Sequence, residues 1–214
     1  MAGDMKEHSI NKKDNMFIKG YYIPHEIVDP FIELSKEFKL VGGAQMTTDN
    51  DVKEWDGKEA YPKECFEYNI THPTCTDPIV NNLLDHIQIA LEKYQDAYPL
   101  LRKQMARWLM SPQFNYQHYP KGKSYNGWHF ERACCTSTRR VLVWMMYLNE
   151  CEDGGETAFL YQKYKMKPEK GLVLFWPPDF THTHRGLPSF KTEKKIITGW
   201  YTFSSVKSPT LAWM

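Results

Sequence analysis

Apolar residues recur at helical spacing in two segments of the N-terminal half. The first segment covers residues 26–38, and its shared face carries Ile27, Phe31, Leu34 and Phe38. Gly42 and Gly43 follow it as a stop. The second begins after Thr76 or Asp77 as N-cap, with Pro78 in its first turn, and its apolar stripe consists of Ile79, Leu83, Leu84, Ile87 and Leu91. We therefore expect two amphipathic helices that pack against the outside of a sheet.

The pattern changes at residue 114, where short runs of β-branched and aromatic residues begin to alternate with turn residues. These runs cover residues 114–119, 128–130, 141–148, 157–161, 172–176 and 196–203. Gly, Pro and Asp lie between them at 120–122, 153–155 and 177–179, where connections are expected. The run at 141–148 is apolar on both faces, as in a fully buried strand. The sequence therefore predicts an antiparallel sandwich or barrel.

A length of 214 residues suits a single domain with one sizeable core. We expect residues 1–110 to supply helical support and outer strands, and residues 111–206 to form the β core that carries the site. The formal net charge is +1, with no block of basic residues. Such a chain has no electrostatic attraction to nucleic acid or to an anionic membrane, so we expect neither as a partner.

The sequence contains no apolar run long enough for a membrane span, and residues 1–15 are too polar for a secretory signal. Five cysteines, an odd number without a Cys-x-x-Cys pair, indicate neither a disulfide framework nor a thiolate zinc site. We therefore expect a cytoplasmic protein in a reducing compartment. The vicinal pair Cys134-Cys135 could be a redox sensor, but small apolar residues that are buried or half-buried are the simpler interpretation.

Two histidines and one glutamate have the spacing of a metal site. His129 and Glu131 are two positions apart, so in an extended strand both side chains point to the same face. The second imidazole, which is the third ligand, must come from another strand, and His182 and His184 follow the 172–176 run. Two imidazoles and one carboxylate leave metal positions open for a chelating co-substrate, which is typical of non-haem iron(II) sites. An oxygenase is therefore the first hypothesis, and a non-catalytic metal-binding module is the alternative.

Further motifs surround these residues in a fixed order. They are Tyr119, Gly122, His129, Arg140, Tyr147-Leu148-Asn149, Gly154-Gly155, Phe175-Trp176, His184 with Pro188, and Lys194 six residues before Trp200. With this set, residues 119–201 resemble the 2-oxoglutarate- and Fe(II)-dependent oxygenases, and among them the prolyl 4-hydroxylase-like branch. The chain departs from that pattern at Glu131, where the family usually has Asp.

The resemblance implies a mainly β fold, a double-stranded β-helix of the jelly-roll, cupin-like type with N-terminal supporting helices. It also implies that His129, Glu131 and His184 hold Fe(II), and that 2-oxoglutarate and O2 are co-substrates. Ascorbate is a candidate reductant by the same resemblance. The extra methylene of Glu131 moves its carboxylate by roughly 1 to 1.5 Å relative to an Asp, unless the side chain folds back or the strand shifts.

By the same resemblance, Lys194 binds the distal carboxylate of 2-oxoglutarate, with hydroxyl groups of Tyr147 and Tyr119 as further donors. In a strand, Lys194 shares its face with Trp200, so Lys195 is expected to point outward. The suggested target is a prolyl residue in a peptide or protein, and a free amino acid or another small metabolite is the alternative. The residues expected to touch substrate are Trp128, Arg132 and Trp200.

Overall fold

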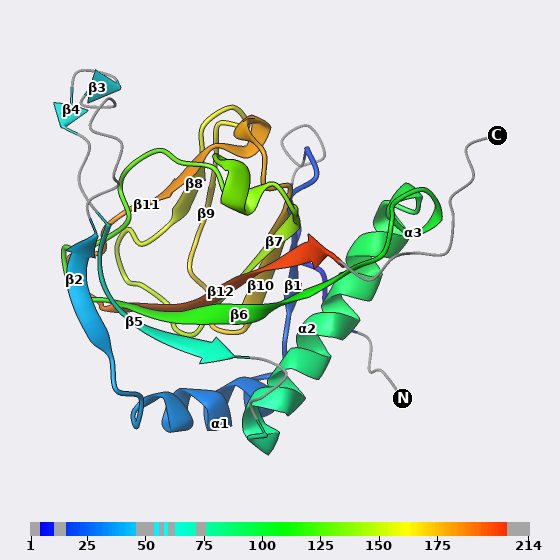
Figure 1. Cartoon of the computed structure of the whole chain (residues 1–214). Coiled ribbons are helices and arrows are strands. Elements are labelled where there is room, and N and C mark those ends of the chain that lie inside the picture. Colours follow the sequence, from blue (N-terminus) through cyan, green and yellow to red (C-terminus); the bar gives the residue numbers. More distant parts are fainter. Residues whose placement is uncertain are drawn as a thin grey trace.

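The computed structural model describes residues 5–10, 16–45, 54–55, 58–59, 63–71 and 76–204. Within them, a large antiparallel sheet faces a small one, and helices cover the outer face of the large sheet (Figure 1). The large sheet has seven strands in the order β1 (Lys19–Tyr22), β10 (Leu172–Trp176), β7 (Arg140–Tyr147), β12 (Lys194–Phe203), β6 (Trp108–Tyr119), β5 (Lys63–Thr71) and β2 (Val41–Gln45). The small sheet has the order β11 (His184–Gly186), β8 (Thr157–Phe159) and β9 (Tyr164–Met166). A separate hairpin pairs β3 (Glu54–Trp55) with β4 (Lys58–Glu59).

The central strands of the large sheet are buried on both faces because each face has its own apolar cluster. One set of alternate β7 side chains joins the cluster under the helices, namely Leu142, Trp144 and Met146. The other set joins the cluster under the small sheet, namely Val143, Met145 and Tyr147. Phe159 of β8 and Met166 of β9 close that second cluster from the opposite side. The prediction of a strand that is apolar on both faces is confirmed.

Apolar spacing marks the two longer helices, and a side-chain cap marks the start of the second. They are α1 (His25–Ser35), α2 (Pro78–Ala97) and α3 (Leu100–Lys103), with the 3₁₀ turns η1 (Cys135–Ser137) and η2 (Phe180–His182). Asp77 is the N-cap of α2, and its carboxylate accepts hydrogen bonds from the backbone N–H groups of Ile79 at 2.8 Å and Val80 at 3.3 Å. Leu83, Leu84, Ile87 and Leu91 of the predicted α2 stripe are buried, Ile79 is half-buried, and α2 contacts α1 and β10. None of the described helices is both long and apolar enough to cross a membrane.

The predicted end of the first helix is wrong. The helix ends before Phe38, and Gly42 and Gly43 lie in β2, where they pair with β5. A Cβ atom on Gly42 would lie 2.4 Å from the ring of Phe66, so the absence of a side chain allows that ring to cover the strand. The two glycines therefore permit an edge strand and do not terminate a helix.

The predicted strand at residues 128–130 is also wrong. Its one strand-like contact is an isolated bridge between His129 and His184. The next backbone N–H groups, those of Glu131 and Arg132, both donate to the carbonyl of Pro178 at 3.0 Å. Since a loop carbonyl accepts both donors, the segment does not continue as a ladder.

Four cysteines lie in the described residues, and all four are free thiols. Cys65 is buried and Cys151 is half-buried, whereas Cys134 and Cys135 are exposed. Cys75 lies outside the described residues. The interpretation of the vicinal pair as buried or half-buried residues is wrong, because η1 begins there and holds its first turn at the surface.

Candidate metal centre and co-substrate pocket

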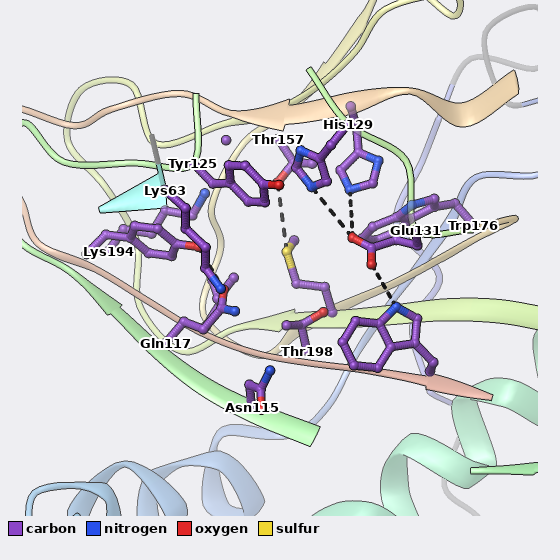
Figure 2. A pocket seen from close by; sticks show the side chains of 16 residues that line it. Lys63, Asn115, Gln117, Tyr125, His129, Glu131, Thr157, Trp176, Lys194 and Thr198 are labelled. Carbon is purple, nitrogen blue, oxygen red and sulfur yellow. Dashed lines mark hydrogen bonds and ion pairs between the residues drawn. The ribbon is translucent and has the colours of Figure 1, made fainter. Parts of the chain in front are cut away.

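Three side chains from two parts of the chain converge on one point between the two sheets. His129 precedes β7, and His184 opens β11. The backbones of these two histidines pair directly, with His129 N–H donating to His184 at 3.0 Å and His184 N–H donating to His129 at 2.8 Å. This bridge sets the two imidazoles side by side, and Glu131 reaches the same point from two residues further on (Figure 2).

The geometry of the three groups fits one divalent ion. Their nearest ligand atoms all lie within 4.8 Å of one another. Oε1 of Glu131 is 3.5 Å from Nε2 of His129 and 3.6 Å from Nε2 of His184. Each Nδ1 lies 2.9 Å from a backbone carbonyl, that of Gly127 for His129 and that of His182 for His184. Because these carbonyls take the Nδ1–H groups, the two Nε2 atoms are free to bind a metal.

The charges of the three groups also suit a metal. Burial alone would raise the pKa of Glu131, but hydrogen bonds and charge interactions with the two imidazoles hold it well below its usual range. Burial, and then the charge of His129, lower the pKa of His184. The centre therefore presents an ionised carboxylate and a neutral His184 imidazole, which are the forms that bind metal.

The second oxygen of Glu131 is held by two donors. Arg140 donates from Nη1 to Oε2 at 3.0 Å, and Trp200 donates from Nε1 to the same atom at 2.9 Å. The guanidinium of Arg140 also lies 3.7 Å from the centre of the Trp200 ring. Trp200 was expected to touch substrate, and its indole N–H instead binds the carboxylate. Oε1 is thus left facing the imidazoles.

A cavity of about 130 Å³ extends from these three groups into the space between the sheets. One strand, β12, contributes Lys194, Ile196, Thr198 and Trp200 to its wall, as the alternation of strand side chains predicts. Figure 2 shows Lys194 at the opposite end of the cavity from Glu131. Lys195 points away, and its ammonium lies 4.0 Å from a carboxylate oxygen of Glu193.

Lys194 is the unusual charge of this cavity. Its residue is 5% exposed, and burial lowers its pKa from 10.5 to about 8. Among the described residues it has no hydrogen-bond or ion-pair partner, and its ammonium faces the rings of Tyr119 at 5.7 Å and Tyr147 at 5.6 Å. A buried cation without an anion is costly, so the cavity is complementary to an anionic ligand.

The two tyrosines expected to help Lys194 have their hydroxyl groups bonded elsewhere. Tyr119 donates to Oε1 of Gln117 at 2.7 Å. Tyr147 donates to the hydroxyl of Thr157 at 2.6 Å, and it does not line the cavity. Burial raises the pKa of both phenols, so both remain neutral donors. Of Lys194, Tyr119 and Tyr147, only Lys194 therefore presents a donor to the cavity that is not already bonded to a described residue.

Two of the residues expected to touch substrate do not line the cavity. The ring of Trp128 lies 4.3 Å from the guanidinium of Arg185. Arg132 forms an ion pair with Asp179, with Nη2 2.6 Å from Oδ1. Both side chains lie outside the set that lines the cavity.

Several cavity residues were not singled out from the sequence. Tyr125 stacks on the imidazole of His129, with ring centres 3.8 Å apart and an angle of 11°. The others that line the wall are Lys63, Asn115, Gln117, Met145, Thr157 and Gly186, next to Trp176 of the Phe175-Trp176 motif. Asn115 and Gln117 share strand parity with Tyr119, so the period of two along β6 was a usable signal. Lys63 lies in a segment for which the sequence predicted no strand, so no alternation pattern pointed to it.

Residues 114–202 match the family model of the 2OG-Fe(II) oxygenase superfamily. The resemblance inferred from the sequence motifs is confirmed, since the matched segment contains the three candidate metal ligands, the cavity lysine and Trp200. Proteins of this superfamily use Fe(II), 2-oxoglutarate and O2.

Relatives of the chain carry the names of prolyl hydroxylases. "Probable prolyl 4-hydroxylase 9" of Arabidopsis thaliana is 28% identical over 143 residues, which cover 52% of this chain and 49% of that protein. The chain thus spans about half the length of this curated relative. The viral collagen prolyl hydroxylase of Paramecium bursaria Chlorella virus-1 aligns with a TM-score of 0.63 and 16% identity, over 91% of this chain and 100% of that one. A Pseudomonas putida prolyl-4-hydroxylase aligns with a TM-score of 0.62 and 16% identity, over 89% of this chain and 95% of that one. These solved structures confirm the double-stranded β-helix.

Proposed function

We propose that this chain is an Fe(II)- and 2-oxoglutarate-dependent dioxygenase that hydroxylates an aliphatic C–H bond of a prolyl residue in a peptide or protein. The observation that carries the proposal is the pairing, in one cavity, of a two-histidine, one-carboxylate cluster with a buried ammonium that has no partner among the described residues. The first feature suits a metal with open positions, and the second suits the far end of a dicarboxylate.

His129, Glu131 and His184 are the proposed ligands of the iron. Two imidazole nitrogens and one carboxylate oxygen on one side leave the other side of an octahedral ion open. The bound iron and 2-oxoglutarate would supply the activation of O2 for hydroxylation, coupled to conversion of 2-oxoglutarate into succinate and carbon dioxide. The protein's part is to orient these groups and to exclude water from them.

Lys194 is the proposed anchor of the distal carboxylate of 2-oxoglutarate. At neutral pH its pKa of about 8 leaves it mostly protonated. The apolar side chains of Ile196 and Met145 line the cavity beside it and suit the two methylene groups of the co-substrate. An incoming carboxylate gives the ammonium the partner that the described residues do not provide, and the resulting pair is shielded from solvent.

The choice of a prolyl target rests on the names of the relatives, and the peptide is proposed as the partner for the same reason. Arg132 and Trp128 do not line the cavity, so their contact with substrate stays a prediction. Cytoplasmic location stays a prediction as well.

Anaerobic titration tests the metal and co-substrate sites separately from turnover. Iron(II) with 2-oxoglutarate should give the weak visible charge-transfer band of the chelate, and His184→Ala should abolish it. Turnover is then tested by mass spectrometry of proline-containing peptides. A matching peptide with 4-hydroxyproline at the target position is the control. A protein that forms the chelate but releases succinate only with free amino acids would favour the small-metabolite alternative.

A further inference from the structure

His182 lies two residues before the proposed ligand His184 and is buried in η2 at 4% exposure. Its ring Nε2 lies 2.5 Å from the carbonyl oxygen of Met16, and its Nδ1 lies 3.0 Å from the hydroxyl of Thr181. Because a carbonyl only accepts, Nε2 carries a hydrogen and donates it to Met16. The ring therefore ties the metal-binding segment to a turn 166 positions earlier in the chain.

That turn has a backbone conformation that its residues do not favour. Met16 has a φ of 28° and Phe17 a φ of 69°, both in the left-handed region that disfavours residues with a side chain. Both side chains are 54% exposed, so their burial contributes little to the turn. Their carbonyl groups are bonded instead, that of Met16 to His182 and that of Phe17 to the hydroxyl of Tyr94 at 2.8 Å. These two hydrogen bonds stabilise the turn against its backbone strain.

The other end of His182 acts on the metal centre. Its backbone carbonyl lies 2.9 Å from Nδ1 of His184 and accepts the hydrogen of that nitrogen. This contact turns Nε2 of His184 toward Glu131, at 3.6 Å from Oε1. The ring and the carbonyl of one buried residue thus connect the Met16 turn to a proposed iron ligand.

We propose that His182 is a positioning residue for the metal centre. Its ring anchors the η2 backbone on the Met16 turn, and its carbonyl then holds the imidazole of His184 in the ligating orientation. The inference rests on the proposed metal site. His182 itself contacts neither the metal position nor the cavity, and its effect passes through His184 alone.

The test compares His182→Leu, which removes the donor at similar volume, with His182→Gln, which retains an N–H donor. The full chain is titrated anaerobically with Co(II), and binding is followed by the visible d–d absorption of the bound ion. Mutation of a residue that hydrogen-bonds a metal-bound histidine typically lowers metal affinity about 10- to 100-fold. Because the His182 ring acts one step further out, we expect about tenfold weaker binding in His182→Leu and recovery to within about twofold in His182→Gln. His118→Gln is the matched control, because His118 bonds Glu193 at 3.0 Å and has no contact with the centre.

A second pair of variants leaves His182 intact and changes the turn. Proline fixes φ at about −65°, so Met16→Pro cannot adopt the turn and should weaken Co(II) binding as His182→Leu does. Glycine adopts positive φ without steric strain, so Met16→Gly should keep the wild-type affinity. In the double variant Met16→Pro with His182→Leu, the two losses should not add, because both remove the same hydrogen bond.

The outcomes separate this inference from the proposed function. If His182→Leu and Met16→Pro lower the melting temperature but bind Co(II) as the wild type does, His182 is only structural and the inference is overturned. If the wild-type chain binds no Co(II) at the centre, the proposed function fails first, and the inference fails with it. Equal loss in His118→Gln would also overturn the inference.

Discussion

Replacing Lys194 with methionine should stabilise the ligand-free protein while weakening its hold on 2-oxoglutarate. Methionine keeps an unbranched chain of similar length and removes the charge. Burial lowers the pKa of Lys194 from 10.5 to about 8. Each pH unit of lowering corresponds to about 1.4 kcal/mol, so the buried charge costs the folded state roughly 3 kcal/mol. We expect Lys194→Met to recover up to that amount at pH 7, as measured by urea unfolding of the ligand-free protein.

The sign of the effect depends on pH in a defined way. Below about pH 8 the lysine is protonated in both the folded and the unfolded chain, so the full cost is present. Between about pH 8 and 10.5 the folded protein loses the proton while the unfolded chain keeps it, and the cost disappears. The stability advantage of Lys194→Met should therefore shrink over this interval and vanish near its upper end.

The same variant should bind 2-oxoglutarate far more weakly. Removing one partner of a buried, hydrogen-bonded charge pair costs about 2–5 kcal/mol, which corresponds to a loss of roughly 30-fold or more in affinity. Binding is measured by anaerobic titration of the charge-transfer band. Lys195→Met is the matched control, because that lysine lies outside the cavity, and both its stability and its affinity should stay near wild type. Equal stability of Lys194→Met and wild type at pH 7, or equal loss of affinity in the two variants, would refute the reasoning.

Three other predictions concern pH, the carboxylate and the thiols. The affinity for 2-oxoglutarate should fall as the pH rises above about 8, because Lys194 loses its proton there. Lys194→Arg should bind without that pH dependence, because a guanidinium stays charged. Parallel pH profiles of affinity in the two proteins would contradict this prediction. Trp200→Phe removes the indole N–H that donates to Oε2 of Glu131 at 2.9 Å. Since a hydrogen bond to a charged group contributes about 1.5–3 kcal/mol, the Co(II) affinity should drop by about tenfold or more. Unchanged affinity would show that Arg140 alone orients the carboxylate. Hydrogen bonds from Thr136 and Ser137 lower the pKa of Cys134 to about 7, so its alkylation by iodoacetamide should rise with a midpoint near pH 7. Burial raises the pKa of Cys65 to about 12, so Cys65 should react only on unfolding. Peptide mapping that finds Cys65 labelled first would count against this prediction.

Local rules were enough for the start of α2 and for strand β10. Asp77 before Pro78 places the start of α2, because an aspartate at that position satisfies the N–H groups that a helix leaves unpaired. The run at 172–176 coincides with β10, because a short apolar run between turn residues has few other stable forms. Period-two alternation also separated Lys194 from Lys195, since that distinction depends only on the direction of successive strand side chains.

Edge strands depended on contacts between distant segments. Gly42 and Gly43 are typical of a helix stop, yet β2 forms there because the Phe66 ring of β5 can lie over a residue without a side chain. Likewise, the 128–130 segment has strand-like composition, but it forms only the bridge at His129, and the N–H groups of Glu131 and Arg132 that follow it donate to the carbonyl of Pro178. No local pattern records either partner.

For this protein the sequence by itself determined the set of candidate metal ligands, the strand that carries the cavity lysine and the family that these motifs resemble. Those features depend on residue type and on spacing within one segment, which the chain carries directly. The tertiary structure alone decided that Arg140 and Trp200 hold Oε2 of Glu131, that the hydroxyl groups of Tyr119 and Tyr147 are bonded elsewhere, and that His182 reaches Met16. Each of these is a contact between groups far apart in the chain or a choice among competing partners, and only the packed fold brings the competitors together.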